Sequence, residues 1–207
     1  MKTTTTAFIA SACAAAFLVA PAAADLLQFT QTGSGSGTLD GVAFDDTTFT
    51  ITALTDTANV DGIAPFSSWT PHLSATIEID GVGTFDILTQ TYTLVEHPGQ
   101  WGAPAVAFAI EWIGGPAGLF WGPMDAVFGT WDTTTELDTV TGDSFHLGWG
   151  LKEFDPQIFT TGGLLYFNNS QEFVEGTFTA TLVPAPGALV LLAGAGLIRR
   201  RRREAAT

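Results

Sequence analysis

Carboxylates are abundant in this sequence and could take part in catalysis. The chain contains 21 aspartate and glutamate residues. Two carboxylates on either side of a glycosidic bond can cleave it, one acting as an acid and the other as a base or nucleophile. Glu111 with Asp125, and Asp132 with Glu136, are the candidate pairs. Because some pairs must lie close by chance among so many carboxylates, we expect no catalysis from them.

The same side chains could instead bind calcium, since hard cations prefer clustered oxygen ligands. One candidate group is Asp40, Asp45 and Asp46, and a second is Asp138 with Asp143. The sequence has neither the Asp-x-Asp-x-Asp-Gly loop nor the glycine-rich nonapeptide that bind calcium elsewhere. We therefore predict no metal site and no cofactor, and keep calcium as an alternative.

Other catalytic motifs are missing from the sequence. The glycine-rich stretch 33–37 fails the dinucleotide-binding fingerprint because Thr38 stands where the last glycine belongs, and Gly35 stands where a nucleophile elbow has serine. We interpret this stretch as a flexible connector between strands. None of the histidines has the His-Glu-x-x-His spacing of a zinc protease; they are His72, His97 and His146. The chain is predicted not to be an enzyme.

The tryptophans are a possible binding feature, because indole rings in glycine-rich loops can stack on sugars. All six fall in the middle of the chain: Trp69, Trp101, Trp112, Trp121, Trp131 and Trp149. Large aromatic side chains also contribute most to the burial of a core, and we expect that role here. Exposed, coplanar tryptophans would indicate a glycan-binding module instead.

The elements that position these residues are predicted to be strands. Apolar and polar residues alternate in 48–53, 74–79, 106–112 and 177–182, which is typical of strands with one buried and one wet face. Asp40-Gly41 and Asp80-Gly81 are hairpin signals. Sustained helical periodicity is absent, apart from one short turn expected within 124–131. The pattern predicts an all-β fold, a single antiparallel β-sandwich or jelly-roll-like domain.

This domain is predicted to span residues 25–183, long enough for one hydrophobic core. Its charge is extreme, because it holds every acidic residue except Glu204, and of the seven basic residues only Lys152. Such a surface repels nucleic acid and anionic lipid headgroups. We therefore exclude a nucleic-acid partner.

The N-terminus has the features of a secretory signal peptide. Lys2 supplies a positive charge and 7–20 form an apolar, alanine-rich run. Ala22 and Ala24 are the small residues of a cleavage site, so the mature chain is predicted to begin at Asp25. Residues 1–24 are thus a signal helix that directs export.

The C-terminal residues 184–207 form a second signal in three parts. Pro184, Ala185 and Pro186 keep the junction extended. The uncharged run 187–198 enters hydrocarbon as a short helix, although a full span needs about 20 residues. A stop-transfer block follows, comprising Arg199, Arg200, Arg201, Arg202 and Arg203. These arginines stay in the cytoplasm and leave the domain outside.

This tail resembles the PEP-CTERM tail of Gram-negative bacterial proteins. The family motif is Pro-Glu-Pro, and Ala185 in place of glutamate is similar to the Val-Pro-Leu-Pro-Ala variant. The resemblance implies that a membrane-embedded exosortase cuts near Pro186. The domain would then be released or transferred to the cell surface or extracellular matrix. A permanent C-terminal membrane anchor is the alternative.

These features predict an exported, exosortase-sorted protein of the cell surface or matrix, with a structural role. Its partners would be the export machinery, the exosortase and, transiently through 187–198, the inner membrane. The alternative is a surface-displayed lectin-like module, with or without calcium, whose partner is extracellular polysaccharide.

Overall fold

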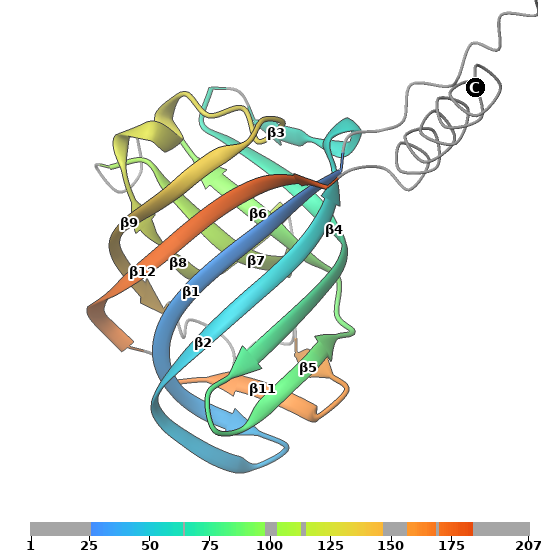
Figure 1. The fold of residues 1–207 in the computed structure, drawn as a ribbon, viewed down its shortest axis with the longest axis vertical. Helices are drawn as coiled ribbons and strands as arrows, with labels where there is room; N and C mark the ends of the chain where they lie inside the picture. Colours follow the sequence, from blue (N-terminus) through green and yellow to red (C-terminus); the bar gives the residue numbers. More distant parts are fainter. Residues whose placement is uncertain are drawn as a thin grey trace, which may run out of the picture.

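The computed structural model describes residues 26–63, 65–97, 103–112, 115–146, 157–168 and 170–183. These ranges form an all-β fold, as predicted (Figure 1). The two predicted flanking helices lie outside the described residues. The strands are β1 (Leu26–Leu39), β2 (Val42–Asp56), β3 (Asp61–Ile63), β4 (Ser67–Ile79), β5 (Gly83–Ile87), β6 (Thr91–Glu96), β7 (Ala105–Trp112), β8 (Gly115–Met124), β9 (Leu137–His146), β10 (Ile158–Thr160), β11 (Gly163–Phe167) and β12 (Ser170–Val183). The short helices are η1 (Thr57–Asn59) and η2 (Ala126–Gly129), and η2 is the helical turn expected within 124–131.

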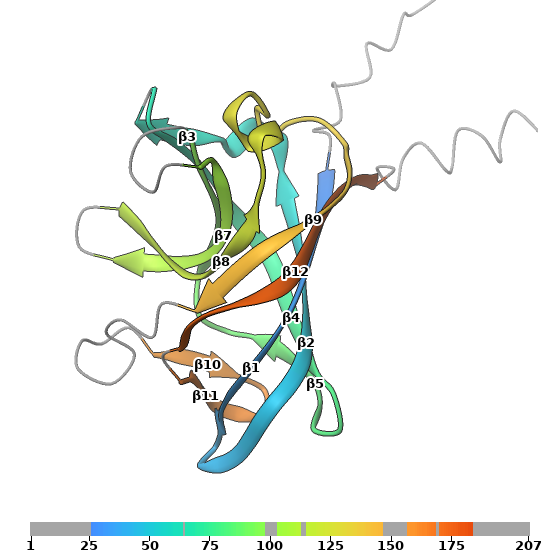
Figure 2. The same ribbon diagram turned by 90° about the vertical axis from the view of Figure 1, so that its left-hand side faces the viewer.

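All the strands belong to one antiparallel sheet that folds back on itself, so that two walls face each other across the core (Figure 2). The order is β11-β10-β5-β4-β2-β1-β12-β9-β8-β7-β6, with β3 beside β4. Additional pairings join β11 to β1 and β4 to β6. The long strands β1, β2 and β4 therefore form a spine shared by two arms of the sheet. Strands β12, β9, β8, β7 and β6 make up one arm, and β5, β10 and β11 make up the other.

The arms separate where neighbouring strands exchange partners. Strand β1 pairs with β12 over 26–32 and with β11 over 37–39. Strand β4 pairs with β6 over 67–71 and with β5 over 75–79. Strands β1 and β4 thus each contribute one end to each arm.

The glycine-rich stretch 33–37 lies at one of these exchange points, inside β1, so its prediction as a connector is wrong. Glycine is needed there for close approach. A Cβ atom on Gly33 would lie 2.3 Å from Cζ of Phe120, and one on Gly37 would lie 2.0 Å from the carbonyl oxygen of Tyr166. The stretch is therefore fixed by packing.

Two predicted hairpins are confirmed. Asp40 and Gly41 join β1 to β2 with φ angles of 48° and 82°, and positive φ at both central residues is the requirement of a type I′ turn. A turn containing Gly81, with φ of 70°, joins β4 to β5. These turns set the register of β1 with β2 and of β4 with β5.

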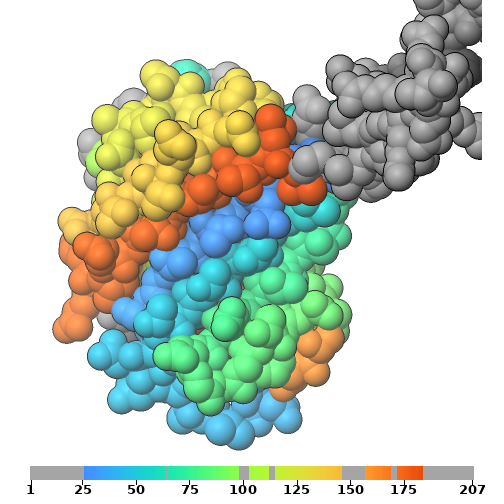
Figure 3. All heavy atoms as spheres, in the orientation of Figure 1, coloured from blue at the N-terminus to red at the C-terminus, as the bar shows by residue number. Residues whose placement is uncertain are grey.

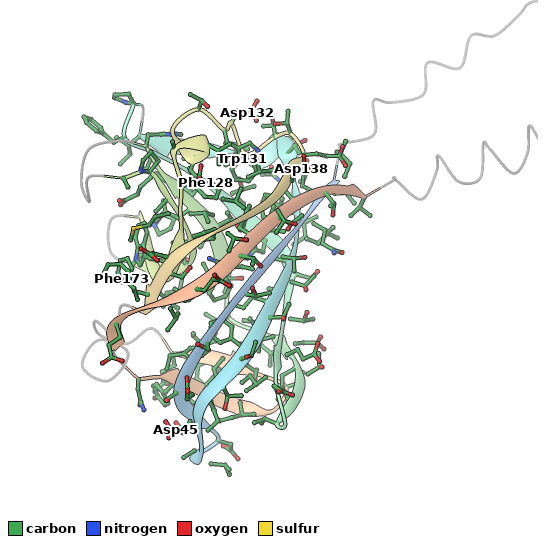
Figure 4. All side chains as sticks on the ribbon, turned by 60° about the vertical axis from the view of Figure 1, so that its left-hand side comes forward. Asp45, Phe128, Trp131, Asp132, Asp138 and Phe173 are labelled. Atoms are coloured by element: carbon green, nitrogen blue, oxygen red, sulfur yellow. The ribbon has the colours of Figure 1, made fainter. Side chains whose placement is uncertain are left out.

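The buried side chains form three clusters. The largest cluster includes Phe49, Ile77 and Phe120, which come from β2, β4 and β8. We call the second the aromatic cluster; its members are Leu27, Phe29, Val95, Val106, Phe128, Trp131, Phe178 and Ala180. Figure 4 labels Phe128 and Trp131 at the upper end, near η2. The alternation predicted for 48–53 and 74–79 matches the burial of these strands, and that predicted for 177–182 holds as far as Ala180. Leu182 was expected on the buried face but is 45% exposed, because it lies at the open end of β12.

Strand β7 differs from its prediction, because both of its faces are buried. Ala105, Ala107 and Ala109 were expected on a wet face but are at most 1% exposed. They belong to the third cluster, in which Trp121 and Phe145 are also buried. Alanine leaves room for these larger rings, so the second face of β7 is covered by its own neighbours.

Candidate functional site

The two ends of the described domain lie next to each other. Leu26 at the start of β1 pairs with Val183 at the end of β12, and both strands end on the same side in Figure 1. In the sequence, the predicted cleavage site thus lies just before one member of this pair, and the predicted sorting motif lies just after the other. The predicted residues themselves lie outside the described ranges: Ala22, Ala24, Asp25, Pro184, Ala185, Pro186, Arg199, Arg200, Arg201, Arg202 and Arg203.

Among the described residues, no helix has the length and apolar character that a membrane span requires, and the apolar run 187–198 lies outside these residues.

The first candidate pair of catalytic carboxylates is separated by the length of a strand. Glu111 pairs with Pro116 at one end of the β7–β8 hairpin, whereas Asp125 follows Met124, which pairs with Ala105 at the other end. Six residues of extended chain span about 20 Å. This separation is far beyond the roughly 5–10 Å that glycosidases use, so the pair cannot act on one bond.

The second pair, Asp132 and Glu136, supports local structure. Asp132 accepts hydrogen bonds from the backbone nitrogen of Thr134 at 3.0 Å and the hydroxyl of Thr135 at 3.1 Å. These bonds, chiefly the one from the Thr134 backbone, lower the pKa of Asp132. Glu136 accepts a hydrogen bond from the backbone nitrogen of Leu182 at 3.1 Å. Both carboxylates thus act as caps for backbone groups.

The candidate calcium ligands fall into two remote places. Figure 4 shows Asp45 at one end of the molecule and Asp138 at the other. Asp45 accepts a hydrogen bond from the Ser36 hydroxyl at 2.5 Å. Asp138 and Asp143 are five residues apart on β9, or about 16 Å along an extended strand. In the described part of the chain, no three His, Cys, Asp or Glu side chains are placed to hold a metal ion together.

The described tryptophans pack into the core. Trp131 is 6% exposed and Trp121 is 4% exposed, while Trp69 is partly buried against the third cluster. Trp131 also donates a hydrogen bond from its indole nitrogen to the carbonyl of Thr135 at 3.1 Å. Trp101, Trp149 and the side chain of Trp112 lie outside the described residues.

The two histidine side chains that the structure describes form hydrogen bonds to groups other than histidine. The ring nitrogens of buried His72 lie 2.8 Å from the Thr91 hydroxyl and 2.9 Å from the Thr93 hydroxyl. Burial lowers the pKa of His72 from 6.5 to about 3. His97 bonds to the carbonyl of Phe128 at 3.1 Å, and the side chain of His146 lies outside the described set.

His72 should make the fold sensitive to acid. Its folded-state pKa is below that of the unfolded chain, so its stabilising contribution is complete above pH 6.5 and is lost as the pH falls toward 3. Between pH 7 and pH 5 the loss is about 2 kcal/mol. The measurement is urea unfolding of wild type and His72→Gln, which does not titrate. We expect their difference in unfolding free energy to shrink by that amount at pH 5; a difference independent of pH would contradict the argument.

Sequence analysis missed one carboxylate with an unusual environment. Glu96, at the end of β6, is half-buried, and desolvation raises its pKa. Its Oε2 atom has no hydrogen-bond partner. Its neighbours across the sheet are Ser67 and Ala105, neither of which titrates. No motif or spacing in the sequence singles it out. Without an ionisable neighbour in the sheet, Glu96 does not form a catalytic pair there.

Among the described residues, the two candidate carboxylate pairs have other positions or roles, and no three metal-ligating side chains meet. The most specific feature is the pairing of the first described residue with the last. The chain matches no protein-family model, no curated protein and no solved structure.

Proposed function

We propose that this chain is an exported, exosortase-sorted protein of the cell surface or extracellular matrix, and that its folded domain has a structural, non-enzymatic role. The observation that carries the proposal is the pairing of Leu26 with Val183. Cleavage after Ala24 and near Pro186 would remove residues on both sides of this pair and leave every described strand intact. Processing at both ends would thus release a complete domain.

The order of the tail supports the direction of transfer. Each arginine costs about 2.5–3.5 kcal/mol at the centre of a membrane helix, so 199–203 stay in the cytoplasm. The apolar run 187–198 is shorter than a full span of about 20 residues. A short run suits a temporary anchor that presents the proline motif at the outer boundary of the membrane.

The proposal is tested by following the protein in its native host. Wild-type protein is expected at the cell surface or in the medium. The double variant Pro184→Ala/Pro186→Ala should accumulate in the inner membrane, because the extended junction that the exosortase reads is lost. The measurement is immunodetection in separated inner-membrane, surface and medium fractions.

Pro116→Ala is the matched control, since it removes a proline from strand β8 and leaves the tail unchanged. This variant should distribute like wild type. Surface delivery of the double tail variant, or retention of wild type in the inner membrane, would refute sorting through this motif.

The lectin-like alternative stays a prediction. Among the described tryptophans, Trp121 and Trp131 are buried and Trp69 is partly buried. A glycan array probed with the mature protein tests it. Binding to a defined glycan would replace the structural role by a recognition role without affecting the sorting proposal.

A further inference from the structure

The outward face of the sheet spine carries threonines in register across neighbouring strands. In a first row, Thr141, Thr177, Thr32 and Thr50 lie side by side on β9, β12, β1 and β2. In a second row, Thr179, Thr30, Thr52 and Thr76 lie side by side on β12, β1, β2 and β4. We call these two rows the threonine array. Figure 1 shows its antiparallel strands side by side across the front of the molecule.

The sheet geometry gives this array a regular spacing. Neighbouring strands are about 4.8 Å apart and alternate residues along a strand are about 6.7 Å apart, so neighbouring hydroxyls have a regular local spacing, which the twist of the sheet rotates gradually from strand to strand. Hydrogen bonds hold some of them in place: the hydroxyl oxygens of Thr32 and Thr177 are 2.6 Å apart, and those of Thr139 and Thr179 are 3.0 Å apart. The same face is even, without a marked hollow, in Figure 3.

The array is also free of charge, in a chain with 21 acidic residues. Outward positions 28–34 of β1, 48–54 of β2 and 177–181 of β12 hold no aspartate or glutamate. Carboxylates return at its margins, with Glu78 on β4 and Glu175 on β12. Strand propensity explains threonine in general, but outward positions on β5 and β9 mix threonine with aspartate. The threonine array therefore presents a neutral patch within an acidic surface.

A neutral lattice of hydroxyl and methyl groups favours a neutral, ordered partner. The stacking of sugar rings needs aromatic side chains, and the outward positions of the array contain none. Ice presents a regular surface of hydroxyl donors and acceptors, and its shortest lattice repeat is close to the separation of neighbouring strands. We propose that the threonine array is an ice-binding surface. This inference does not depend on sorting, because the array belongs to the folded domain.

The test measures incorporation of the full chain into slowly growing ice, together with thermal hysteresis. Wild-type protein should enter the ice and separate its melting and freezing temperatures. Thr30→Tyr/Thr52→Tyr should lose both effects, down to the level of a protein that does not bind ice, because two bulky rings hold the array away from a flat surface. Tyrosine suits strands, so the fold should persist; circular dichroism checks this.

Val42→Tyr is the matched control, since it adds the same ring at an exposed position beside the β1–β2 turn, outside the array. It should retain wild-type activity. Should the double tyrosine variant not fold, Thr30→Val/Thr52→Val keeps the branched shape, removes two hydroxyls and should reduce incorporation. Exclusion of wild-type protein from ice would overturn the proposal, as would full activity of a folded array variant. Binding of wild type to cellulose or chitin without ice binding would assign the array to crystalline polysaccharide instead.

Discussion

Replacing Phe178 by alanine is expected to lower the free energy of unfolding by about 3–5 kcal/mol, because it opens a cavity in a core that cannot fully close around it. Phe178 is 1% exposed and lies at the centre of the aromatic cluster. Its ring centroid is 5.6 Å from that of Phe29, 5.8 Å from that of Phe128 and 5.5 Å from that of Trp131. Denaturant unfolding of the full chain measures the loss.

Phe173→Ala is the matched control on the same strand. Phe173 is 62% exposed and contacts the ring of Phe145, with centroids 5.7 Å apart; Figure 4 shows it away from Phe128 and Trp131. Its loss should cost about 1 kcal/mol or less. Equal losses for the two variants would mean that the aromatic cluster is not the stabilising core of this arm.

Raising the salt concentration from 0.01 M to 1 M is expected to stabilise the fold by about 3 kcal/mol, or roughly 10 °C in Tm. The domain is crowded with carboxylates, and every lysine and arginine lies outside the described ranges. Two like charges 10 Å apart repel by about 0.4 kcal/mol in water, and many such pairs add up. Salt shortens the Debye length from about 30 Å to about 3 Å and removes this repulsion. Differential scanning calorimetry gives the shift.

Divalent cations extend this experiment to the calcium alternative. If the charge serves only solubility, calcium and magnesium at equal ionic strength should raise Tm alike. A larger rise with calcium would reveal a specific site by mass action. An unchanged Tm across all salts would show that carboxylate repulsion does not limit stability.

Local structure could be predicted because it depends on near neighbours in sequence. Thr48 to Ala53 alternate so that Phe49 and Ile51 enter the core, and Asp40-Gly41 can adopt the positive φ angles that its turn requires. The closure of the sheet could not be predicted in this way. It depends on pairings such as Gly37 with Phe167, which join segments far apart in the chain.

The errors in the predictions have the same origin. The glycine-rich stretch resembled a connector because its close contacts, with Phe120 and Tyr166, come from distant strands. The alanines of β7 resembled a wet face because Trp121 and Phe145 cover them only in the folded sheet. The spacing between Glu111 and Asp125, from which no catalysis was expected, could not show that a hairpin holds them at opposite ends. The sorting residues lie outside the described ranges, so their roles rest on the sequence pattern.

The proposed sorting is tested most directly by the intact mass of the mature protein isolated from its native host. The account predicts a chain that begins at Asp25 and ends near Pro186, found at the cell surface or in the medium. Such a chain keeps the paired ends Leu26 and Val183 and lacks 187–207. A mass that includes Arg199–Arg203, measured on protein from the inner membrane, would contradict the account and establish the tail as a permanent anchor.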